Sequence, residues 1–132
     1  MKTAIVILRV FLGLMGAMLL FQGFMWSFLP ETNLEMNGIT TDSILGINMI
    51  KSDIGGALLT AGTFLGLFAL QGRKWFYPTV IVAGGYFMVR TVSLFMDGSH
   101  PTIIIGIVIE AVVIVTSVIL NNLLRARDHE NV

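Results

Sequence analysis

Residues 102–124 read TIIIGIVIEAVVIVTSVILNNLL, and Glu110 is the only charged residue in this stretch. A helix needs about 20 mainly apolar residues to cross the hydrocarbon layer of a bilayer. Three further apolar stretches of similar length precede it, at residues 3–29, 50–70 and 76–96. We therefore predict an all-α integral membrane protein, a four-helix bundle that forms one domain over residues 1–124. A polar cytoplasmic tail is predicted to follow at residues 125–132.

The composition supports a membrane protein. Hydrophobic residues make up 55% of the chain, charged residues only 12%, and the mean hydropathy is +0.86, whereas soluble domains are about 25% charged. The eight basic and eight acidic residues cancel and form no basic block, so nucleic acid is not an expected partner. The absence of cysteine excludes disulfides, thiolate metal sites and thiol nucleophiles. With only two histidines, we expect neither a metal nor a cofactor.

The charges in the connections predict the orientation. Basic residues occur at the start, between the second and third apolar stretches, and in the tail: Lys2, Arg73, Lys74, Arg125 and Arg127. Cytoplasmic segments carry an excess of Lys and Arg, so both termini are predicted to be cytoplasmic. The first stretch is too long for the apolar region of a signal peptide, and no small-residue cleavage site follows Pro30. We therefore expect it to be retained.

The two outer connections are predicted to differ in form. The connection over residues 31–48 either lies on the membrane surface as an amphipathic segment or starts the second helix early, with Asp42 or Ser43 as the cap. Gly98 supplies a tight turn between the third and fourth helices, which are therefore expected to form an antiparallel hairpin.

Small and polar residues share one face of each predicted helix. On the second helix this face contains Asp53, Thr60 and Gln71. Small residues let helices approach closely in lipid. Gly62 and Gly66 lie on the other side of that helix, where they are candidates for a dimer contact. The predicted packing glycines are Gly13, Gly16, Gly55, Gly56, Gly62, Gly66 and Gly106.

Four charged residues are predicted to gather in the outer half of the bundle. A charge at the bilayer centre costs on the order of 3 kcal/mol. Counted from the outer turn, Arg90 lies about 10 Å deep and Glu110 about 13 Å deep. Lys51 and Asp53 enter the second helix from the same side. Adjacent helices therefore bring opposite charges to nearly the same level.

Three roles fit this cluster. The pair of Arg90 and Glu110 fixes the helix register, or the cluster lines an outward-opening pocket for a small molecule or lipid headgroup, or Glu110 relays protons. The candidate ligand-binding residues are Lys51, Asp53, Tyr86, Arg90, Ser93 and Glu110. Arg9 lies near the inner boundary, where it acts as an orientation anchor or contacts Gln71 or Asn121.

The run from Lys51 to Gly56, KSDIGG, is followed by Gly62, Arg90, the Asp97-Gly98 turn, Pro101 and Glu110. Over residues 47–120 this pattern resembles a widespread bacterial family of small four-helix membrane proteins known only as a domain of unknown function. The family usually has Arg at the first basic position, and Lys51 departs from it, which weakens a bidentate role there. The resemblance implies the fold, the outer charge cluster and a place in the bacterial cytoplasmic (inner) membrane, and it implies no activity.

Three classes of function remain after these exclusions. The leading hypothesis is a small membrane protein that binds a lipid or hydrophobic small molecule, or serves as an accessory subunit. The alternatives are an oligomeric transporter or channel, proton-coupled through Glu110, and an intramembrane enzyme. An enzyme is not favoured, because the chain has no recognisable catalytic motif. The expected partners are membrane lipids and either further copies of the chain or a larger membrane complex.

Overall fold

The computed structural model describes residues 1–36, 40, 43–96, 98–99 and 101–130. Helices account for 94% of these residues, and no strand occurs among them. Four helical segments are long and apolar enough to cross a membrane: Lys2–Phe28, Ile44–Gln71, Arg73–Met96 and Ile103–Glu130. The protein is therefore all-helical with four candidate membrane spans, as the sequence predicts.

The second of these spans is built from three consecutive elements. A short α-helix is followed without a break by a π-helical segment and then by a longer α-helix. In chain order the elements are α1 (Lys2–Phe28), α2 (Pro30–Met36), α3 (Ile44–Met49), η1 (Ile50–Gly55), α4 (Gly56–Gln71), η2 (Arg73–Trp75), α5 (Phe76–Met96) and α6 (Pro101–Glu130).

Local sequence explains where the second span begins. The Ser43 hydroxyl accepts a hydrogen bond from the Gly46 N–H at 2.9 Å, which caps α3. The early start of the second helix is therefore confirmed with Ser43 as the cap, whereas Asp42 lies outside the described residues. The predicted turn contains Gly98 at φ +97°, a left-handed conformation that suits glycine. Asp97 and His100 of that turn also lie outside the described residues.

The last helix is longer than its apolar stretch. The sequence predicts an end at residue 124, but α6 continues to Glu130, so most of the polar tail is helical. An ion pair of 3.1 Å between Arg73 Nη1 and Asp128 Oδ2 links this end of α6 to η2. The tail is therefore attached to the connection between the second and third spans.

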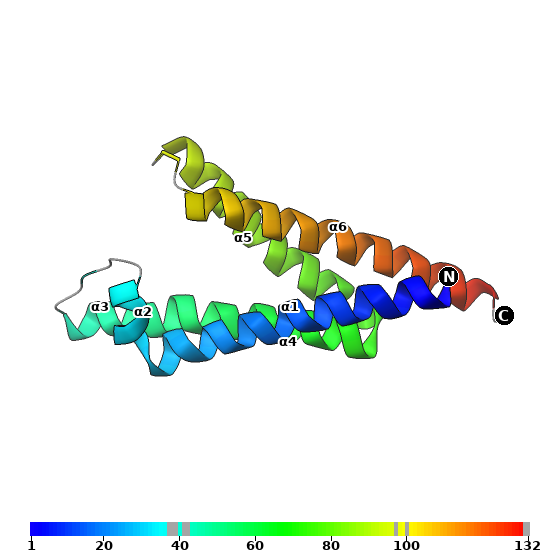
Figure 1. Ribbon diagram of the computed structural model, residues 1–132, viewed down its shortest axis with the longest axis horizontal. Helices are drawn as coiled ribbons and strands as arrows, with labels where there is room; N and C mark the ends of the chain where they lie inside the picture. The colour runs from blue at the N-terminus through cyan, green and yellow to red at the C-terminus, as the bar shows by residue number, and fades with distance from the viewer. Residues whose placement is uncertain (37–39, 41–42, 97, 100, 131–132) are drawn as a thin grey trace.

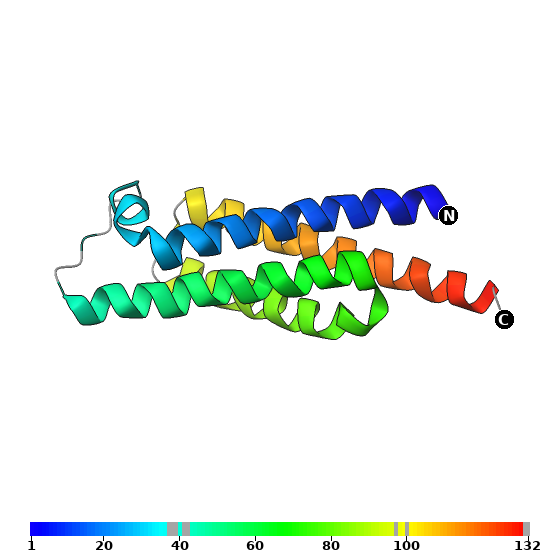
Figure 2. The same ribbon diagram turned by 90° about the horizontal axis from the view of Figure 1, so that it is seen from below.

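The long helices form two pairs. Figure 1 shows α1 beside α4 in one pair and α5 beside α6 in the other. The two pairs approach each other at the end that carries both termini and diverge toward the other end (Figure 1). Seen from below, the members of the α1/α4 pair run alongside each other over most of their length (Figure 2). The space between the pairs therefore widens away from the termini.

Glycines allow the backbones of α1 and α4 to touch. A Cβ added to Gly62 would lie 2.8 Å from both the Gly16 carbonyl oxygen and the Leu20 nitrogen. A Cβ on Gly16 would lie 3.0 Å from the Gly66 nitrogen. Gly62 thus serves a contact within the chain, and the backbone of Gly66 lies against Gly16 while its own Cβ position is open. Lipid solvates Leu and Ile well, so close van der Waals contact of this kind is what holds helices together in a membrane.

The prediction of which face of the second span is buried is wrong. Asp53, Thr60 and Gln71 are exposed, whereas Gly62 and Leu65 are buried. The Thr60 hydroxyl donates to the Gly56 carbonyl oxygen of its own helix at 2.9 Å, so it needs no partner across an interface. Of the predicted packing glycines, Gly16, Gly55 and Gly62 are buried at close contacts. Gly13 is in ordinary contact with Ala69, and a Cβ on Gly56 would meet open space.

A buried core joins the two pairs near the termini. Leu12 of α1, Phe68 of α4 and Leu120 of α6 are completely buried there. The cluster also includes these side chains: Ile5, Leu65, Ala69, Val113 and Leu124. The buried core that the two pairs share is therefore at the terminal end.

The glycine contact generates a prediction with a matched control. We expect Gly62→Ala to lower stability by roughly 1–3 kcal/mol, because its methyl group must push two backbones apart. We expect Gly66→Ala, four residues along the same helix, to leave stability unchanged or raise it. Its methyl would meet open space, and alanine is the better helix former. Thermal unfolding in mild detergent, followed by circular dichroism, measures both. Equal melting temperatures for the two variants would refute the contact.

Candidate functional site

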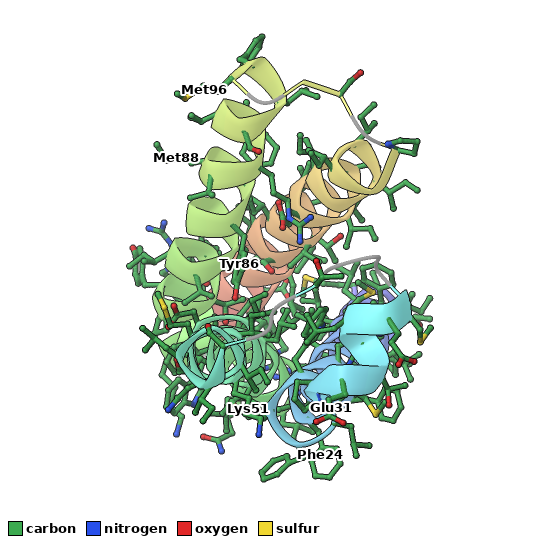
Figure 3. The ribbon with its side chains drawn as sticks, turned by 90° about the vertical axis from the view of Figure 1, so that its left-hand side faces the viewer. Phe24, Glu31, Lys51, Tyr86, Met88 and Met96 are labelled. Carbon is green, nitrogen blue, oxygen red and sulfur yellow. The ribbon has the colours of Figure 1, made fainter. Side chains whose placement is uncertain are left out.

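A cavity of about 160 Å³ lies where the two helix pairs begin to diverge. Side chains from α1, α4, α5 and α6 line it, and most of them are apolar. Figure 3 shows Tyr86 between the two pairs. The cavity rests on the buried core, because Leu65 and Val113 belong to both. The apolar lining residues include Met15, Met18, Leu19, Leu58, Ala61, Val82, Ala83 and Ile109.

One wall of the cavity is polar. Tyr86 and Arg90 are four residues apart on α5, and Gly106 and Glu110 are four residues apart on α6, so each pair shares one helix face. Arg90 Nε lies 2.7 Å from Glu110 Oε1, and the exposed fractions of the two side chains are 37% and 14%. The prediction that the hairpin brings these opposite charges together is confirmed.

Gly106 provides the space for the arginine. A Cβ at this position would lie 2.5 Å from Arg90 Nη1 and 2.8 Å from Arg90 Cζ. The guanidinium therefore packs against α6 at Gly106, one turn before Glu110. A side chain at position 106 would require the flexible end of Arg90 to shift. The glycine therefore leaves room for the arginine in the position that it takes beside Glu110.

Several polar atoms at this wall have unused hydrogen-bonding capacity. The Tyr86 hydroxyl and Glu110 Oε2 are buried and find no hydrogen-bond partner among the described residues. Arg90 Nε is close to Glu110 Oε1, but its N–H is not aligned for a hydrogen bond. Buried polar groups are satisfied in most proteins, so these atoms have the capacity to bind a water, an ion or a ligand. The wall presents both donors and acceptors, and its two formal charges cancel.

The structure does not bring all the predicted residues to this wall. Lys51 and Asp53 lie in η1, are exposed and do not line the cavity. Asp53 Oδ1 accepts a hydrogen bond from the Ser52 hydroxyl at 3.0 Å, and Figure 3 shows Lys51 directed away from the α5/α6 pair. Ser93 is half-buried on α5 beyond Arg90 and does not line the cavity either. The site therefore consists of Tyr86, Arg90, Gly106 and Glu110.

Sequence reasoning missed the apolar part of the site. Met15, Leu19 and Leu58 occur among many similar residues, and nothing in their spacing separates a cavity wall from a lipid-facing surface. The small and polar face predicted for the fourth helix does include Ser117, which is completely buried on α6 with no hydrogen-bond partner among the described residues. No three Asp, Glu or His side chains in the described ranges gather in a way that could hold a metal ion.

Comparison with known proteins adds no further identification. No family model, curated protein or solved structure matches the chain. The function must therefore be inferred from the geometry itself.

Breaking the ion pair from either side should be costly. We expect Glu110→Gln and Arg90→Met each to lower stability by roughly 1–3 kcal/mol, because each leaves one charge without its partner. We expect the double variant to lose less than the sum, because neither charge then remains. Denaturation of the wild type, the two single variants and the double variant in detergent completes a double-mutant cycle. Strictly additive losses would mean that the two side chains do not interact.

Proposed function

We propose that the chain crosses the bacterial cytoplasmic membrane four times as a loosely closed four-helix bundle, with both termini in the cytoplasm. Both termini lie at one end of the molecule, and η2 with its two basic residues lies at the same end (Figure 1). Cytoplasmic connections carry the excess of Lys and Arg. We infer the bacterial membrane solely from the resemblance of residues 47–120 to a bacterial membrane family. The diverging half of the molecule would then face outward.

The orientation can be tested with single cysteines, because the chain has none of its own. Ser99 and Ala126 are exposed and lie at opposite ends of α6. In spheroplasts we expect a membrane-impermeant maleimide to label Ser99→Cys at once and Ala126→Cys only after lysis. The reverse pattern would invert the proposed topology.

We further propose that the protein binds one lipid or other amphipathic small molecule in the cavity between the helix pairs. The observation that carries this proposal is the set of unsatisfied polar atoms, the Tyr86 hydroxyl and Glu110 Oε2, beside an otherwise apolar cavity. Sites for small molecules commonly combine an apolar lining with a few placed polar groups. Placed polar groups beside an apolar cavity are typical of binding sites, so we favour binding over a purely accessory role.

The charges of the wall indicate the chemical class of ligand. Arg90 and Glu110 neutralise each other, so the wall does not favour a strongly charged headgroup. A hydroxyl or amide group can donate to Glu110 Oε2 and accept from the Tyr86 hydroxyl, which satisfies both atoms. About 160 Å³ resembles a cavity that holds a benzene-sized molecule, so only part of a lipid fits inside. The ligand is therefore a neutral amphipathic molecule whose remaining chain leaves between the diverging pairs.

Native mass spectrometry of the protein purified in mild detergent tests the proposal. We expect the wild type to carry a small-molecule adduct that Glu110→Gln weakens at least about tenfold, since a hydrogen bond to a charged group is lost. We expect Ala61→Phe to abolish the adduct, because Ala61 lines the cavity and a phenyl ring would fill it.

Two controls distinguish binding in the cavity from nonspecific lipid association. Ala17→Phe places the same ring on an exposed position of α1, and Glu35→Gln neutralises an exposed carboxylate at the end of α2. Both should retain the adduct. An adduct that survives Ala61→Phe in the folded protein, or the absence of any adduct from the wild type, would overturn the proposal.

A further inference from the structure

A second pocket lies at the terminal end of the molecule, remote from Arg90 and Glu110. It is a polar hollow of about 310 Å³. Three elements build it: α1, the connection around η2, and the last turns of α6. The polar side chains around it are Arg9, Gln71, Arg73, Lys74, Arg127 and Asp128.

The charges around this pocket do not balance. Four of the lining residues are cations and Asp128 is the single carboxylate. Asp128 already contacts two of the cations, since Oδ2 is 3.1 Å from Arg73 Nη1 and Oδ1 is 3.8 Å from Arg127 Nη2. Among the described residues no ion pair joins a carboxylate to Arg9 or Lys74, so these two cations give the pocket an excess of positive charge.

Arg9 is a cation of this pocket without an anionic partner among the described residues. Its Nε is buried without a hydrogen-bond partner, and no carboxylate among the described residues forms an ion pair with it. A guanidinium stays protonated in proteins, so it cannot lose its charge to avoid this environment. Arg9 lies on a predicted membrane span, seven residues after Lys2, which corresponds to about 10 Å along the helix.

The backbone fixes the position of this arginine. Gly72, at φ +82°, is buried, and a Cβ there would lie 3.3 Å from Arg9 Nη2. The glycine lets the chain turn from α4 into η2 directly against the guanidinium. This turn places Arg73 and Lys74 at the same pocket as Arg9. Cations from distant parts of the sequence are thus held together before any ligand arrives.

We propose that this pocket binds a phosphate group. Guanidinium groups bind phosphate oxygens through paired, charge-assisted hydrogen bonds. Basic pockets between membrane helices at the cytoplasmic side are suited to anionic lipid headgroups. The phosphate belongs either to an anionic phospholipid of the adjacent leaflet or to a soluble phosphate ester, and both present the same anion to Arg9.

Binding of dioctanoyl-phosphatidylglycerol to the delipidated protein in nonionic detergent tests the proposal, with native mass spectrometry as the readout. Dioctanoyl-phosphatidylcholine, which carries no net charge, is the reference lipid. We expect the anionic lipid to bind one site at least about tenfold more tightly than the reference. Glycerol 3-phosphate is then added as a competitor. Displacement of the lipid indicates a soluble phosphate ester as the ligand, and persistence indicates a lipid headgroup.

Variants decide whether the cations of the pocket are responsible. We expect Arg9→Gln and Lys74→Gln each to weaken anionic-lipid binding at least about fivefold. Arg125→Gln removes the same charge from an exposed position of α6 that does not line the pocket, and it should bind like the wild type. Lys74 is exposed, so its variant carries the test if Arg9→Gln fails to fold. Equal binding of the two lipids, or equal weakening by Arg125→Gln, would overturn the proposal.

Discussion

The contact of α1 with α4 through Gly16 and Gly62 is the constraint on which the other packing depends. Within a bilayer, Leu and Ile gain little from leaving lipid, so helices associate where their backbones approach closely. This contact joins α1 and α4 as one pair. The α5/α6 hairpin meets that pair through the core around Phe68 and Leu120 near the termini. Beyond this core the pairs separate, and the cavity between them is the direct result.

Within the cavity, the ion pair between Arg90 and Glu110 depends on the space beside Gly106. Gly106 leaves space for the Arg90 side chain against α6, and the next turn of the same helix supplies Glu110. The ion pair removes the net charge, but it leaves the Tyr86 hydroxyl and one oxygen of Glu110 unsatisfied. A pair that served only to fix helix register would not require the tyrosine hydroxyl beside it. The arrangement therefore suits a ligand with a neutral polar group and an apolar body.

The two pockets differ in charge as well as in position. The cavity beside Glu110 is mostly apolar and has balanced charges, whereas the hollow beside Arg9 is polar and positive. A single amphipathic molecule would not satisfy both, because the buried core around Leu12 and Leu120 separates them. The physical chemistry thus favours two sites of different specificity. The site in the diverging half suits a neutral ligand, and the site at the end that carries the termini suits an anion.

The sequence by itself determined the four spans and the pairing of Arg90 with Glu110, and it gave Ser43 as one of two candidate caps. These features depend on length, hydropathy and residue counting from a turn, all of which are local. Only the tertiary structure decided which helix faces pack. Thr60 satisfies its hydroxyl within its own helix, so polarity did not mark the buried face of α4, and the glycine side was buried instead. The fit of α1 against α4 likewise decided two further features. Lys51 and Asp53 lie outside the cavity, and Arg9 shares a pocket with residues of η2.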